Sequence, residues 1–152
     1  MAAFLSGVFE AELQKAVALA LFIPVVLALA ESVSIQSVSL ALQALRGKQP
    51  TMQTILKKLK SEFVTGLFLG VASGVAVAIV ALLWVGQVRV VVCLLGGIAG
   101  GVTCAAMIGV SMPNIIRMLH REPQVAAGPV ALASTDLVTL LIYFALARWL
   151  LG

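Results

Sequence analysis

The sequence predicts an all-α fold, a polytopic bundle of four long membrane-spanning helices. Hydrophobic residues make up 62% of the chain and charged residues only 11%, whereas about a quarter of the residues are charged in soluble domains. Apolar runs long enough to cross a hydrocarbon core of ~30 Å recur along the chain. A length of 152 residues leaves room for one compact helical unit. We therefore expect residues 1–152 to form a single transmembrane domain, with no soluble domain.

The N-terminal segment Met1–Phe9 is apolar but too short to span a bilayer. It lacks the basic region of a signal peptide, so we expect an N-terminal helix stub, the end of a membrane helix whose beginning is missing. The first long span is predicted over about 13–45. Pro24 and the polar stretch Glu31–Ser37 predict a kink or a break in it near mid-membrane.

Three further spans follow, each bounded by loop residues. After the loop 46–50, a short amphipathic piece is expected over 51–60, and the second span over about 63–85. The third span is predicted over about 90–119 and the last over about 125–151. Small residues recur on the second and third spans, which predicts faces where helices approach closely. The glycines of these faces are Gly66, Gly70 and Gly74, and then Gly97 and Gly101.

The distribution of basic residues predicts the orientation in the lipid bilayer. Most of them lie in 46–60 and 117–123, while 86–89 holds a single arginine. The positive-inside rule places the first two loops in the cytoplasm and the C-terminus outside, as expected for a multi-pass protein of the cell (inner) membrane. Because topology explains these charges, the net charge of +4 indicates no nucleic-acid partner.

Asp136 is the residue most at odds with its surroundings. It lies near the middle of the last span, where a carboxylate costs several kcal/mol unless it faces water, a partner or a cation. Thr135 precedes it and Thr139 follows one turn later, so we interpret this stretch as lining a cation path. Asp136 could alternatively form a hydrogen bond to a neighbouring helix, be buried as a protonated acid, or be the N-cap of a helix. A helix that starts at Asp136, however, would be too short to span the membrane.

Glu31 is the second acidic residue near mid-membrane, about midway between Lys15 and Arg46. A polar helical face continues from it, formed by Ser32, Gln36, Ser39 and Gln43. Lipid cannot satisfy such groups, so the face indicates a water-lined path. Hydrogen bonding between helices at a dimer contact is the alternative, because serine and glutamine commonly do this in membranes.

No nucleophile–base set, phosphate-binding loop or Cys/His metal cluster is present in the sequence, so we do not expect an enzyme. An intramembrane aspartyl protease needs two coupled aspartates, and Asp136 is the only aspartate. Cys93 and Cys104 are eleven residues apart on one predicted helix, a separation of about 16 Å. This exceeds the reach of a disulfide.

The C-terminal half resembles the MgtE-type magnesium transporters. The similarity lies in a proline-ended helix, a short basic loop, a Gly-Pro pair and a last helix with one aspartate. The residues that carry it are Pro113-Asn-Ile-Ile-Arg117, Glu122-Pro-Gln-Val-Ala-Ala-Gly-Pro129, Asp136 and Leu141-Ile-Tyr-Phe144. Earlier stretches are similar to the family's second and third transmembrane helices, namely Phe22-Ile-Pro24-Val-Val, Gln36-Ser37, Arg46-Gly47, and the Gly66, Gly70 and Gly74 series before Leu82-Leu-Trp84. The resemblance covers about residues 8–151.

The resemblance implies a homodimer that transports Mg²⁺, and other divalent cations with it. Asp136 of both chains would be the central ligand around the pore, and the backbone carbonyl of Leu132 would assist it. This suits Mg²⁺, which usually takes one or two carboxylates and keeps several waters. One departure is Ala30-Glu31-Ser32-Val-Ser34-Ile-Gln36, where the family usually has Gly-Gly-Asn-x-Gly-x-Gln. It adds the carboxylate of Glu31 as a further metal ligand.

A second departure is that the family's cytoplasmic sensor and CBS domains are absent from this sequence. Gating by cytosolic Mg²⁺ would then require a separate regulatory cytoplasmic chain. Two other functions stay open. One is a proton-coupled exporter of lipophilic cations that uses Glu31, although aromatic residues, which bind such cations, total only 6%. The other is a membrane packing subunit that transports nothing.

Overall fold

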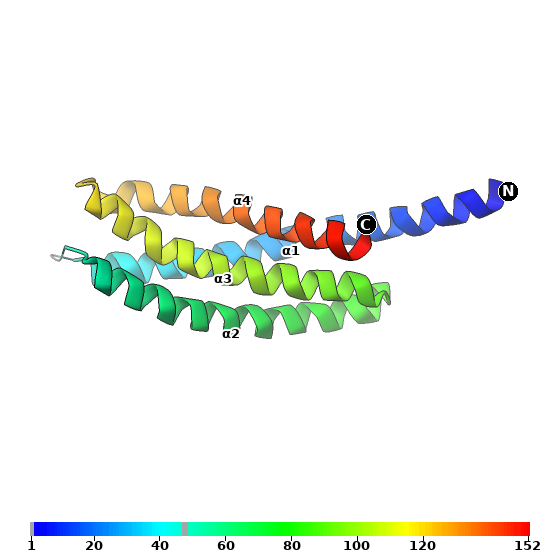
Figure 1. The fold of residues 1–152 in the computed structure, drawn as a ribbon, viewed down its shortest axis with the longest axis horizontal. Coiled ribbons are helices and arrows are strands. Elements are labelled where there is room, and N and C mark those ends of the chain that lie inside the picture. Colours follow the sequence, from blue (N-terminus) through cyan, green and yellow to red (C-terminus); the bar gives the residue numbers. More distant parts are fainter. Residues whose placement is uncertain (1, 47–48) are drawn as a thin grey trace.

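The computed structural model describes residues 2–46 and 49–152, which form four long helices (Figure 1). They are α1 (Ala2–Ala44), α2 (Met52–Val85), α3 (Val88–Met118) and α4 (Pro123–Leu151). Each contains a stretch long and apolar enough to cross a membrane. The predicted fold class, an all-α bundle of four membrane helices, is confirmed.

Three predicted breaks are not found in the helices. The N-terminal stub is not a separate element, because α1 is continuous from Ala2 and passes through Pro24 and the stretch Glu31–Ser37. Strong helix formers, Glu10–Lys15, join the stub to the span. The amphipathic piece at 51–60 is likewise the first part of α2. Thr51 caps this helix by accepting a hydrogen bond from the Thr54 amide, and no helix-breaking residue follows before the apolar run.

The helices run alternately up and down, so that the connections fall at two ends. The α1–α2 and α3–α4 connections lie at one end of the bundle, and the α2–α3 turn and both termini lie toward the other (Figure 1). The turn contains Gly86 at φ 69°, a left-handed conformation that suits glycine at a helix C-terminus. The two loops predicted to be cytoplasmic therefore share one end of the molecule.

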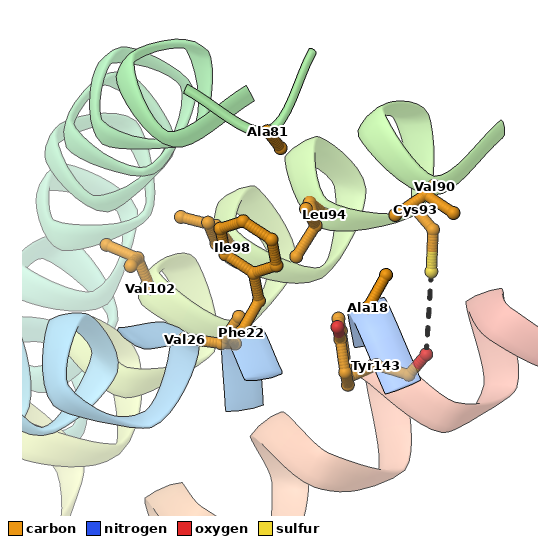
Figure 2. Packing of buried hydrophobic residues seen from close by; sticks show 10 residues of the cluster. All are labelled: Ala18, Phe22, Val26, Ala81, Val90, Cys93, Leu94, Ile98, Val102 and Tyr143. Carbon is orange, nitrogen blue, oxygen red and sulfur yellow. Dashed lines mark hydrogen bonds between the residues drawn. The ribbon is translucent and has the colours of Figure 1, made fainter. Parts of the chain in front are cut away.

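Helix α3 is the centre of the bundle. It packs against α1, α2 and α4, whereas α1 and α2 scarcely touch. Half of its most apolar stretch is buried, against 22–28% for the other three helices, whose remaining surface is therefore free for lipid or for another chain. The main apolar cluster joins all four helices around Leu94 and Ile98 of α3, with Phe22 of α1, Ala81 of α2 and Tyr143 of α4 (Figure 2).

Glycines mark the places where helices approach closely. A Cβ at Gly70 would lie 2.8 Å from the carbonyl oxygen of Ala99, and one at Gly66 would lie 2.9 Å from Ala106 Cβ. Gly74 faces Leu95 in the same way. The three glycines of α2 thus lie along α3. The glycines Gly97 and Gly101 of α3 lie along α4, since a Cβ at Gly97 would meet the Tyr143 ring and one at Gly101 would meet Thr139. Both cysteines are free.

Candidate cation site

Asp136 lies in the middle of α4, thirteen residues after Pro123 and fifteen before Leu151. Its side chain is half-buried. The Oδ1 atom is buried and has no hydrogen-bond partner, although buried polar atoms are nearly always paired in proteins. The nearest basic residue along α4 is Arg148, twelve residues or roughly 18 Å away. At this depth the carboxylate therefore lacks a positive partner on its own helix.

Glu31 of α1 faces Asp136 across the contact between α1 and α4. The two carboxyl groups lie near enough to each other for their charges to interact. Two carboxylates at such a distance repel each other unless a proton or a cation lies between them. The two residues are 105 positions apart in the sequence, and the structure brings them together.

Hydroxyl groups flank this acidic pair on the inner side of α4. Thr135 is fully buried and donates a hydrogen bond of 3.0 Å to the Ser34 hydroxyl of α1. Thr139 is also buried, against Gly101 of α3, and its Oγ1 has no hydrogen-bond partner. Both threonines, expected to line a path, therefore lie inside the bundle next to Asp136.

The other expected path residues lie on the outer surface of α1. Ser32, Gln36 and Ser39 are all exposed, and the Ser32 hydroxyl donates a hydrogen bond of 2.7 Å within its own helix, to the Ala28 carbonyl. Ser34 and Ser37, which lie between them in sequence, are buried. The polar residues of α1 thus form two faces, one that packs against the bundle and one that is open.

A contact between α1 and α2 was not anticipated. The Ser37 hydroxyl donates a hydrogen bond of 3.3 Å to Oε2 of Glu62 in α2. Ser37 is six residues beyond Glu31, roughly 9 Å along α1 toward the α1–α2 connection. The signal in the sequence was an acidic residue two positions after the last of three nearby lysines, which resembles an ordinary solvated helix end.

The remaining predicted ligand is the backbone carbonyl of Leu132. Leu132 is half-buried and one turn before Asp136 on the same continuous helix. Within the part of the chain that the structure describes, no group of three or more His, Cys, Asp or Glu side chains could hold a metal ion.

Comparison with known proteins places the chain in a family. The family model of MgtE, described as a divalent cation transporter, matches residues 23–146. The chain is 30% identical over 139 residues to the magnesium transporter MgtE of Bacillus subtilis, covering 91% of this chain and 31% of that protein. It is 28% identical to MgtE of Enterococcus faecalis over 91% of this chain and 31% of that protein. For Thermus thermophilus MgtE the identity is 27%, over 94% of this chain and 32% of that protein.

The matched region contains both Glu31 and Asp136, the whole of α2 and α3, and most of the apolar stretches of α1 and α4. The chain spans about a third of the length of these relatives. It is a multi-pass membrane protein that belongs to the MgtE family.

Proposed function

We propose that this chain is the MgtE-like transmembrane domain, residues 1–152, of a divalent cation transporter, with Mg²⁺ as the transported ion. The observation that carries this proposal is the buried, unpartnered Oδ1 of Asp136 beside the carboxyl group of Glu31. A divalent cation would supply the positive charge that no side chain on α4 provides at this depth. The relatives' names as magnesium transporters support the choice of ion.

The path for the ion is proposed to lie at the axis of a homodimer. Ser32, Gln36 and Ser39 are exposed on a helix that would otherwise present them to lipid, where polar groups cannot be satisfied. A second copy of the chain would enclose this open face together with water. Two Asp136 and two Glu31 carboxylates, with the Leu132 carbonyls, would then surround a hydrated ion, and Thr135 and Thr139 would support α4 from inside.

The proposed orientation follows from charge and topology. The basic α1–α2 and α3–α4 connections lie at the same end of the bundle. With the chain in the inner membrane of the cell, this end would face the cytoplasm. The C-terminus would then lie outside. Control of opening would come from a separate cytoplasmic chain or from further domains such as those that lengthen the relatives.

The proposal is tested by Mg²⁺ entry into liposomes that contain the purified protein. Asp136→Asn keeps the size of the side chain and removes its charge, so we expect the flux to fall to the level of empty liposomes. Glu12→Gln, which removes a carboxylate outside the matched residues 23–146, is the matched control and should keep the flux. Unchanged flux in Asp136→Asn would overturn the cation site. Movement of a lipophilic cation dye alone would instead favour an exporter that uses Glu31.

A further inference from the structure

A polar cavity lies at the end of the bundle where α3 passes into α4. It has a volume of about 210 Å³ and is lined by Arg117, His120, Arg121, Glu122 and Gln49. Arg117 is half-buried, and the other four residues are exposed. None of them belongs to the candidate cation site, which lies in the middle of the membrane.

The backbone gathers the basic side chains around this cavity. His120 has a positive φ of 56°, the left-handed conformation that commonly ends a helix. The Arg121 amide then donates back to the Ile116 carbonyl at 3.1 Å, which turns the chain sharply after α3. Arg117 and Arg121 therefore line the same cavity, and Gln49 from the α1–α2 connection lines it as well.

Large apolar side chains surround the same turn. Leu119 is 67% exposed and Val125 is 81% exposed, and Met118 is also exposed. A basic cavity with an apolar rim, at the end of membrane-spanning helices, matches an amphiphile with an anionic head and hydrocarbon tails. Basic pockets between transmembrane helices on the cytoplasmic side bind anionic lipid head groups.

We propose that this cavity binds the phosphate head group of an anionic phospholipid. The two arginines donate hydrogen bonds to the phosphate, Gln49 and His120 contact the rest of the head group, and the acyl chains lie along Leu119 and Val125. Guanidinium groups suit this role because they pair with phosphate oxygens in a bidentate manner. The carboxylate of Glu122 opposes the phosphate and limits the affinity.

The test measures binding of phosphatidylglycerol to the purified full-length chain in neutral detergent by native mass spectrometry. Each basic group near the membrane surface contributes about 1 kcal/mol, so Arg117→Gln/Arg121→Gln should weaken binding by roughly tenfold or more. Lys57→Gln/Lys58→Gln removes the same charge from the start of α2 and should weaken binding by a smaller factor. Equal losses in the two double variants would overturn the site, because they would indicate attraction to net charge alone.

Two further measurements keep the proposal falsifiable if the arginine variant folds poorly. Glu122→Gln removes the opposing carboxylate and should tighten binding of phosphatidylglycerol; unchanged or weaker binding would contradict the proposed position of the head group. Inorganic phosphate distinguishes lipid from the free anion. It should compete only at concentrations far above those of the lipid, and competition at equal concentration would show that the apolar rim contributes nothing and would overturn the lipid assignment.

Discussion

The ring of Tyr143 in α4 packs directly onto Gly97 in α3. A Cβ on Gly97 would lie 2.7 Å from Cδ2 of the ring, closer than real Cβ contacts. The Tyr143 side chain is fully buried there, and its hydroxyl donates a hydrogen bond of 2.8 Å to the Leu19 carbonyl of α1. One side chain thus contacts α1 and α3 from α4.

We expect Gly97→Ala to destabilise the protein by about 1–3 kcal/mol, since a methyl group would overpack this contact. Thermal unfolding in detergent measures the loss. Gly128→Ala is the matched control, because Gly128 is also within a helix and nothing lies within 4 Å of a Cβ placed on it. Equal stability of the two variants would contradict the tight contact.

Glu31, like Asp136, should contribute to the affinity of the site for the ion. Glu31→Gln removes one carboxylate of the pair, and we expect the concentration for half-maximal Mg²⁺ flux to rise about tenfold, a change of ~1.4 kcal/mol. Glu31→Asp keeps the charge and should retain more of the affinity than Glu31→Gln. If Glu31→Gln instead transports Mg²⁺ at lower concentrations than the unaltered protein, Glu31 is not a ligand.

The position of α1 against α3 should matter for transport as well as for stability. A Cβ on Gly109 would lie 2.6 Å from both the Ser34 carbonyl oxygen and Ser37 Cβ. Gly109→Ala should therefore push α1 away, lengthen the Ser34–Thr135 hydrogen bond and reduce Mg²⁺ flux several-fold, at a cost of about 1–3 kcal/mol. In Gly96→Ala the new methyl meets the flexible end of Leu146 at 3.0 Å, so this variant should keep its flux. Normal Mg²⁺ flux in both variants would show that transport does not depend on the packing of α1 against Gly109.

The Ser37–Glu62 hydrogen bond should couple two helices that otherwise scarcely touch. A double-mutant cycle of Ser37→Ala and Glu62→Gln measures this coupling through unfolding in detergent. Hydrogen bonds between membrane helices average about 0.6 kcal/mol, and we expect a coupling of that order or above, because the acceptor is a carboxylate. Additive effects of the two substitutions would show that the bond contributes nothing.

The sequence was sufficient for features that depend on composition and periodicity. Four apolar runs between basic loops predict four spans, and the glycine spacing on α2 predicts a face that the structure lays along α3. The predicted helix break at Pro24 was wrong, because proline removes only one hydrogen bond and the flanking residues keep the helix continuous. Ser61 and Glu62 similarly allow the amphipathic piece to continue into α2.

The relations between helices could not be obtained from one sequence. The rotation of α1 about its axis decides that Ser34 faces Thr135 while Ser32 is exposed, and this rotation is set by packing against Gly109 of α3. The meeting of Glu31 with Asp136 depends on the same rotation, since 105 positions separate them in the chain. Periodicity placed Ser32, Gln36 and Ser39 on one face of the helix, but it could not tell that this face is exposed while Ser34 and Ser37 are buried.

The ion proposed here is a divalent cation that occupies the place beside the unpartnered carboxylate oxygen of Asp136. Anomalous scattering from crystals of the protein grown with Mn²⁺ in place of Mg²⁺ locates the ion directly. We predict a peak within a hydrated-ion distance of both Asp136 and Glu31, on the side of the open face of α1, and its loss in Asp136→Asn. A peak elsewhere with none near Asp136, or an Asp136 side chain turned toward lipid, would contradict the proposed cation site.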